Sequence, residues 1–156
     1  MKKVLLSILM LSSVVFARVV DETTGWEYDA STQQAFYMFA SIAVDGIDVE
    51  SADVLGAFKD GECIGFTNAI PTAEGGYTTL PLMGLDGPVF GLQSGDVPDE
   101  ILLYDTSNGS TLSLAASDDL PGWANNEIYI IEGISAANNT FGCMDESACN
   151  YNEDAT

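Results

Sequence analysis

Histidine is absent from the 156-residue sequence, and only 4 residues are Lys or Arg, against 24 Asp or Glu. Without histidine the commonest general base is missing, and so are the Ser-His-Asp and Cys-His machineries. No G-x-S-x-G, H-E-x-x-H or phosphate-binding glycine loop is present either. Carboxylate pairs remain, but among 24 acids some pair meets any spacing rule by chance. The composition therefore indicates a protein that is not an enzyme.

The first residues have the three parts of a cleavable signal peptide. Met1-Lys2-Lys3 is a positive start, Val4–Phe16 is an apolar core, and Val15-Phe16-Ala17 is a cleavage site of the small-x-small type. The core is too short to span a bilayer comfortably, and acidic sequence follows it. We expect residues 1–17 to be removed. The mature protein, beginning at Arg18, is then secreted or at the cell surface, with no membrane insertion.

Cleavage makes the chain still more acidic. Loss of Lys2 and Lys3 leaves Arg18 and Lys59 as the basic residues and moves the formal net charge from −20 to −22. Such a chain cannot neutralise phosphates, which argues against nucleic acid and anionic membranes as partners. The acids have two interpretations: a solvated surface that keeps an exported protein soluble, or ligands for Ca²⁺.

The clearest structural signal is a β-hairpin. Val54–Lys59 and Glu62–Thr67 flank Asp60-Gly61, a pair suited to a two-residue turn with positive φ. This register places Lys59 opposite Glu62, as an ion pair, and Phe58 opposite Cys63. It predicts that the other face carries Leu55, Ala57, Ile64 and Phe66.

Further short strands follow the same pattern, and no stretch has helical periodicity. Pro81 predicts an edge position or a break in its strand, and residues 84–98 read as a long loop. Residues 18–135 are therefore expected to form one all-β domain, an antiparallel β-sandwich of immunoglobulin-like or jelly-roll-like type. The other expected strands are 36–44 before Asp45-Gly46, 77–83, Glu100–Asp105 before Asn108-Gly109, Thr111–Ala115 and Glu127–Glu132.

Three segments resemble a β-sandwich module of secreted, multi-domain proteins from marine Bacteroidetes-like bacteria. They are Trp26-Glu27-Tyr28-Asp29, the hairpin within 53–65, which is similar to an "AAF-x-x-G-E-C-R-G" pattern, and Glu100–Asp105. Gly56 and Ile64 depart from the hairpin pattern. The resemblance implies an exported sandwich without an established enzymatic role.

After a linker at 136–141, residues 142–156 resemble the first part of a "G-C-T-D-x-x-A-C-N-Y-N-x-x-A-x-x-D-D-G-S-C" repeat from exported proteins of the same bacteria. The chain ends before the second half, as a truncated frame would. The segment crowds oxygen donors suited to Ca²⁺, but the alternative is a solvated, disordered acidic tail. The candidate Ca²⁺ ligands are Asp145, Asn150, Asn152 and Asp154.

Three cysteines are an odd number for an exported protein. Cys143 and Cys149 can pair with each other or with cysteines beyond residue 156. Cys63, within the hairpin, is expected to be a small buried residue with an inert thiol. With no histidine and scattered cysteines, the sequence also argues against zinc.

The aromatic residues leave two functions open. Trp26 and Trp123 are candidate platforms for stacking sugar rings, and the alternative is that each fills the core. Tyr37 and Tyr129 lie within apolar strands and are expected to pack inside. We expect a non-catalytic structural or adhesive module, with a carbohydrate-binding module as the alternative. Its partners would be extracellular glycans or other surface proteins.

Overall fold

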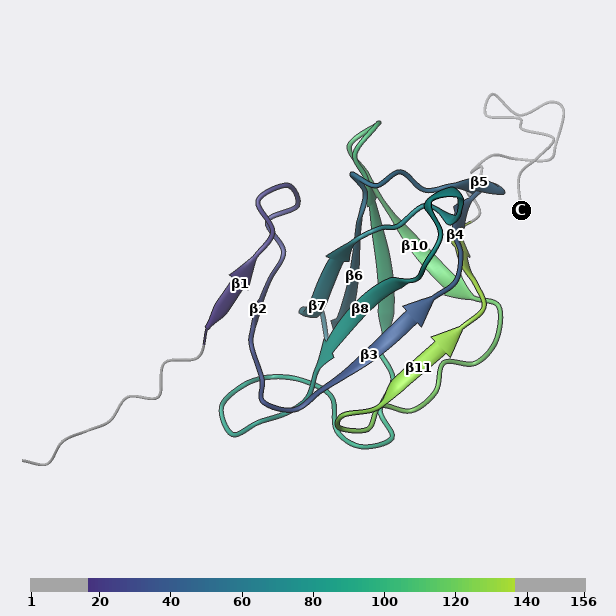
Figure 1. Cartoon of the computed structure of the whole chain (residues 1–156). Coiled ribbons are helices and arrows are strands. Elements are labelled where there is room, and N and C mark those ends of the chain that lie inside the picture. The colour runs from purple at the N-terminus through teal and green to yellow at the C-terminus, as the bar shows by residue number, and fades with distance from the viewer. Residues whose placement is uncertain (1–16, 137–156) are drawn as a thin grey trace, which may run out of the picture.

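The computed structural model describes residues 17–136, and their regular structure is β-strand apart from one 3₁₀ turn, η1 (Thr72–Glu74) (Figure 1). The predicted all-β class is confirmed. Within this described range no helix is long and apolar enough to cross a membrane. The signal peptide up to Phe16, the linker after Ala136 and the Cys/Asp/Asn segment lie outside the described residues.

Two sheets face each other across one core, and a small hairpin lies outside them (Figure 1). The hairpin consists of β1 (Arg18–Val20) and β2 (Glu27–Asp29). The smaller core sheet has the order β11 (Ile128–Ile131), β3 (Gln34–Phe39) and β8 (Thr78–Met83). The larger sheet has the order β5 (Ile47–Asp48), β4 (Ile42–Val44), β12 (Ile134–Ala136), β10 (Ser110–Ala116), β9 (Glu100–Asp105), β6 (Val54–Lys59) and β7 (Glu62–Asn68).

Two chain segments cross from one sheet to the other at a shared corner. The segment expected as a single strand over 36–44 breaks at Ala40 and Ser41 into β3 and β4, and β11 and β12 break beside it. β11 pairs with β3 and β12 with β4, both in parallel. At the corner the Ala40 amide donates to Ile131 O (2.9 Å) and the Ile134 amide to Ser41 O (3.1 Å). The sandwich is therefore mixed, not purely antiparallel.

Side chains from both sheets fill the core. Tyr37 and Phe39 of β3 are 0 % and 1 % exposed, as expected for Tyr37. The Tyr37 hydroxyl donates to the Pro121 carbonyl, and burial raises the Tyr37 pKa to about 12. Tyr129 is half-buried, with its ring edge-on to Tyr37 at 5.2 Å and its hydroxyl on Gly122 O at 2.8 Å.

The central hairpin forms where predicted, with φ values of 50° at Asp60 and 80° at Gly61. Phe58 lies opposite Cys63 and Lys59 opposite Glu62. Lys59 forms its ion pair with Asp99, at 2.7 Å, instead of the expected pair with Glu62. Asp99 also accepts a hydrogen bond from the Asp60 amide (2.8 Å), so it holds the turn from outside the hairpin.

The prediction about the two faces of this hairpin is also wrong. The register shifts after Ala57, so Ala57 pairs with Gly65 and Gly56 with Phe66. A β-bulge adds one residue to one strand and thereby reverses the side-chain alternation beyond it. Phe66 therefore shares a face with Gly56 and Phe58, while the opposite face keeps the fully buried Leu55 and Ala57.

β8 is an edge strand of its sheet, as Pro81 predicts. Its backbone comes so close to β7 that a Cβ added at Gly65 would lie 1.7 Å from Pro81 O. The expected loop over 84–98 contains only isolated bridges. At the other end of the domain, the sequence predicts that the linker begins at Ala136. In the structure Ala136 belongs to β12 and is 5 % exposed.

Candidate functional site

The β1–β2 hairpin lies over the outer face of β6 and β7. Arg18 pairs with Asp29 and Val20 with Glu27 in an antiparallel ladder. Trp26, just before β2, rests on β6, where a Cβ added at Gly56 would lie 2.6 Å from its ring. Glycine at this position therefore makes room for the indole.

Two edge-to-face ring contacts join the hairpin to the sheet. Trp26 meets Phe58 with ring centroids 5.2 Å apart at 84°, and Tyr28 meets Phe66 at 5.2 Å and 70°. Such pairs contribute about 0.5–1.5 kcal/mol each beyond the area they bury. Phe66 can make its contact only because the bulge turned it to this face.

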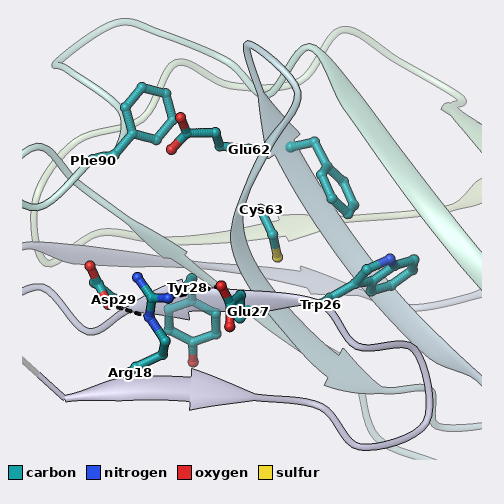
Figure 2. A pocket seen from close by; sticks show the side chains of 9 residues that line it. Arg18, Trp26, Glu27, Tyr28, Asp29, Glu62, Cys63 and Phe90 are labelled. Atoms are coloured by element: carbon teal, nitrogen blue, oxygen red, sulfur yellow. Dashed lines mark hydrogen bonds and ion pairs between the residues drawn. The ribbon is translucent and has the colours of Figure 1, made fainter.

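A half-open pocket of about 360 Å³, which we call the outer pocket, lies between the hairpin, β6–β7 and the loop that carries Phe90. Figure 2 shows Glu62 and Phe90 across the pocket from Arg18, Tyr28 and Asp29. Its size falls in the usual range for small-molecule sites. The lining residues are Arg18, Trp26, Glu27, Tyr28, Asp29, Phe58, Glu62, Cys63 and Phe90.

The charges on the pocket wall are unequal. Arg18 donates hydrogen bonds to Glu27 (2.9 Å) and to Asp29 (3.2 Å). The hydrogen bond to Asp29, and then the negative charges of Glu27 and Asp29, raise the pKa of Arg18. Glu62 is exposed and takes part in none of the ion pairs among the described residues. The pocket wall thus carries three carboxylates and one guanidinium, and two of the carboxylates already form ion pairs with it.

The Cys63 sulfur points into the outer pocket from β7 (Figure 2). The side chain is half-buried, and burial raises the thiol pKa to about 11. Its hydrogen-bond contact is with Gly65 O at 3.6 Å. Since the thiolate is the nucleophile, this environment keeps the group unreactive at neutral pH. The sequence-based expectation of an inert thiol agrees with this environment, although the residue is only partly buried.

The two candidate sugar-stacking residues lie in different places. Trp26 is half-buried and lines the outer pocket. Trp123 is 3 % exposed, its Nε1 donates to Leu82 O (3.1 Å), and its ring fills the space left by Gly84. A buried ring cannot stack on a ligand, so the prediction of a platform at Trp123 is wrong. The polar residues around it in sequence gave no sign of this burial.

A second cavity of about 260 Å³, near β4, β5 and β9, is lined by several acids. The most buried, Asp53, is 4 % exposed and accepts hydrogen bonds from the Glu50 amide (2.9 Å) and from the Thr106 amide (2.9 Å) and hydroxyl (3.0 Å). The Asp53 carboxylate therefore stabilises the neighbouring loops at Glu50 and Thr106. Across the described part of the chain, no cluster of three or more His, Cys, Asp or Glu is arranged to hold a metal ion.

The candidate Ca²⁺ ligands and the candidate disulfide are not placed by these observations. All six lie beyond the last described residue, Ala136. They stay predictions for Asp145, Asn150, Asn152, Asp154, Cys143 and Cys149.

Of the outer pocket, the sequence predicts Trp26 as a ligand contact. The sequence also places Glu27, Tyr28 and Asp29 in one motif. It predicts Phe58 and Cys63 as a cross-strand pair. Nothing local linked them to Phe90, which comes from a loop. Comparisons with protein-family models, curated proteins and solved structures found no match for this chain.

Proposed function

We propose that this protein is a non-catalytic, adhesive binding module of a secreted or cell-surface bacterial protein, and that it holds carbohydrate in the outer pocket. The observation that carries the proposal is the lining, in which four aromatic side chains and three carboxylates border one half-open cavity of about 360 Å³. Concave sites of this size are the usual form of a small-ligand site.

The chemistry of the lining suits a sugar. Aromatic rings offer flat apolar faces, and carboxylates accept hydrogen bonds from hydroxyl groups. The same lining does not suit catalysis, because Glu27 and Asp29 are both engaged by Arg18 and the Cys63 thiol is held protonated.

A purely structural role is the second candidate. It is favoured by the ring contacts of Trp26 and Tyr28, which already attach the β1–β2 hairpin to the sheet. In that case the pocket is a by-product of packing, and the domain is a spacer or assembly unit.

Glycan binding by the full chain separates the two roles. We expect retention on at least one immobilised polysaccharide, and a loss of about tenfold or more in affinity for Phe90→Ala. Phe90 is suitable because it is 37 % exposed and comes from a loop, so its removal leaves the core intact. Tyr77→Ala is the matched control, since Tyr77 is 39 % exposed and lies outside the pocket lining.

Two results would decide against carbohydrate binding in the outer pocket. One is no retention on any polysaccharide by a folded chain, which leaves the structural role. The other is an equal loss in the Phe90 and Tyr77 variants, which would place the contact elsewhere.

A further inference from the structure

The charge on the wall of the outer pocket carries information about its ligand. Glu27, Asp29 and Glu62 outnumber Arg18, which leaves an excess of two negative side-chain charges, or of one when the α-ammonium of a mature chain that begins at Arg18 is counted. Arg18 already forms ion pairs with Glu27 and Asp29 on the hairpin, so an incoming anion would compete with two carboxylates for its guanidinium. Glu62 lies on the other side of the pocket and joins no ion pair within residues 17–136.

This arrangement ranks the kinds of sugar. A uronic or sulfated sugar would meet repulsion from the wall and from the whole acidic chain. A neutral sugar would gain nothing from the excess charge. A sugar with a protonated amine would gain from it, because a half-enclosed pocket screens charges less than open water does.

The aromatic side chains act in the same direction. A cation over a ring face is attracted by the ring quadrupole, most strongly by tryptophan. Trp26, Tyr28, Phe58 and Phe90 surround the same cavity as the carboxylates. An ammonium group in this pocket would therefore have aromatic and anionic neighbours together.

We propose that the outer pocket selects glycans with protonated amino groups, that is, units of amino sugar, with Glu62 as the ammonium acceptor. This rests on the proposed function and specifies the chemical class of its ligand. It predicts that replacing the amine by an N-acetyl group or a hydroxyl weakens binding, although the ring and its other substituents are unchanged.

The test is calorimetric titration of the full chain in mildly acidic buffer, in which the amine of the ligand is protonated. The ligands are the β-1,4-linked trisaccharides of glucosamine, N-acetylglucosamine and glucose. We expect the glucosamine trisaccharide to bind about tenfold more tightly than the other two. We expect Glu62→Gln to remove that preference and to leave the weaker binding of the glucose trisaccharide unchanged.

Glu74→Gln is the matched control for general attraction between an acidic protein and a cation. Glu74 is exposed in η1 and outside the pocket, so its change should leave the preference intact. An equal effect of Glu74→Gln and Glu62→Gln would overturn the proposal, and so would a trilysine peptide that binds as tightly as the glucosamine trisaccharide.

The remaining outcomes separate this inference from the proposed function. Equal affinity for all three trisaccharides would overturn the amino-sugar selection and leave carbohydrate binding in place. Binding of none of them, nor of any immobilised polysaccharide, would overturn both.

Discussion

Single residues in this domain take their properties from partners distant in the sequence. Lys59 is bound by Asp99 and not by Glu62, its neighbour across the hairpin. Asp99 also accepts a hydrogen bond from the Asp60 amide, so one carboxylate just before β9 holds the two-residue turn of the central hairpin. The Trp123 indole is enclosed in the same way, by Leu82 and Gly84.

Asp99 predicts a pH dependence of stability. The Asp60 amide and then Lys59 hold the pKa of Asp99 below its usual range. Its contribution to the free energy of unfolding is therefore complete above about pH 4, the ordinary carboxyl pKa, and is lost as the pH falls through the lower folded value. We expect Asp99→Asn to flatten the acid limb of stability against pH in denaturant titrations. An unchanged acid limb would contradict this.

Cys63 predicts slow alkylation. Burial raises its pKa from 9.0 to about 11, which lowers the thiolate fraction at neutral pH about a hundredfold. We expect iodoacetamide to modify Cys63 about a hundredfold more slowly in the folded chain than in urea, as followed by mass spectrometry of its peptide. Equal rates in the two states would show an open and ionised thiol.

Among the elements, β11 shows most clearly how one strand has two environments. Ile128 and Ile130 are 61 % and 67 % exposed, while Ile131 is 7 % exposed and belongs to the core. Alternation on a strand at the edge of its sheet explains the difference.

Ile130 and Ile131 therefore form a matched pair for mutation. We expect Ile131→Ala to lower the free energy of unfolding by about 2–5 kcal/mol, because it leaves a cavity. Ile130→Ala should change it by no more than about 0.5 kcal/mol. Urea unfolding of both variants gives the comparison, and similar losses would mean that the outer face of β11 is covered.

At the scale of secondary-structure elements, a strand could be predicted from sequence only where the alternation of side chains was long enough to recognise. The strands on both sides of Asp60-Gly61, of six and seven residues, are predictable because alternation and turn chemistry agree there. β1, β2 and β12 have three residues each, too few for a period to show. The bulge after Ala57 has no local signature, so the side taken by Phe66 was missed. The outer pocket needed all of these features together.

At the scale of the whole molecule, repulsion between acids is the dominant electrostatic feature. The sequence has 24 acidic and 4 basic residues, and the described part contains three ion pairs, all with exposed or half-exposed partners. Exposed ion pairs add little to stability, and the other acidic side chains are left to repel one another.

This balance predicts that salt stabilises the protein. Raising the ionic strength from about 0.01 to about 1 M shortens the Debye length from about 30 to about 3 Å and screens the repulsion. We expect the melting temperature to rise by about 4 °C for each kcal/mol of repulsion removed. Calorimetry in NaCl gives the value. A melting temperature that falls with salt would mean that the ion pairs dominate.

The corner shared by the two crossing segments has a consequence for the order in which the domain folds. The Ser41 hydroxyl meets the Glu132 carbonyl across 91 positions of sequence, and β11 and β12 are the last strands described. Parallel pairing of such distant segments loses loop-closure entropy before stabilising contacts form. These contacts therefore form late and slowly. The central hairpin is expected to form earlier because its contacts are local. The two sheets join at this corner only when the final strands have formed, so the domain folds as one unit only when the chain as far as Ala136 is available.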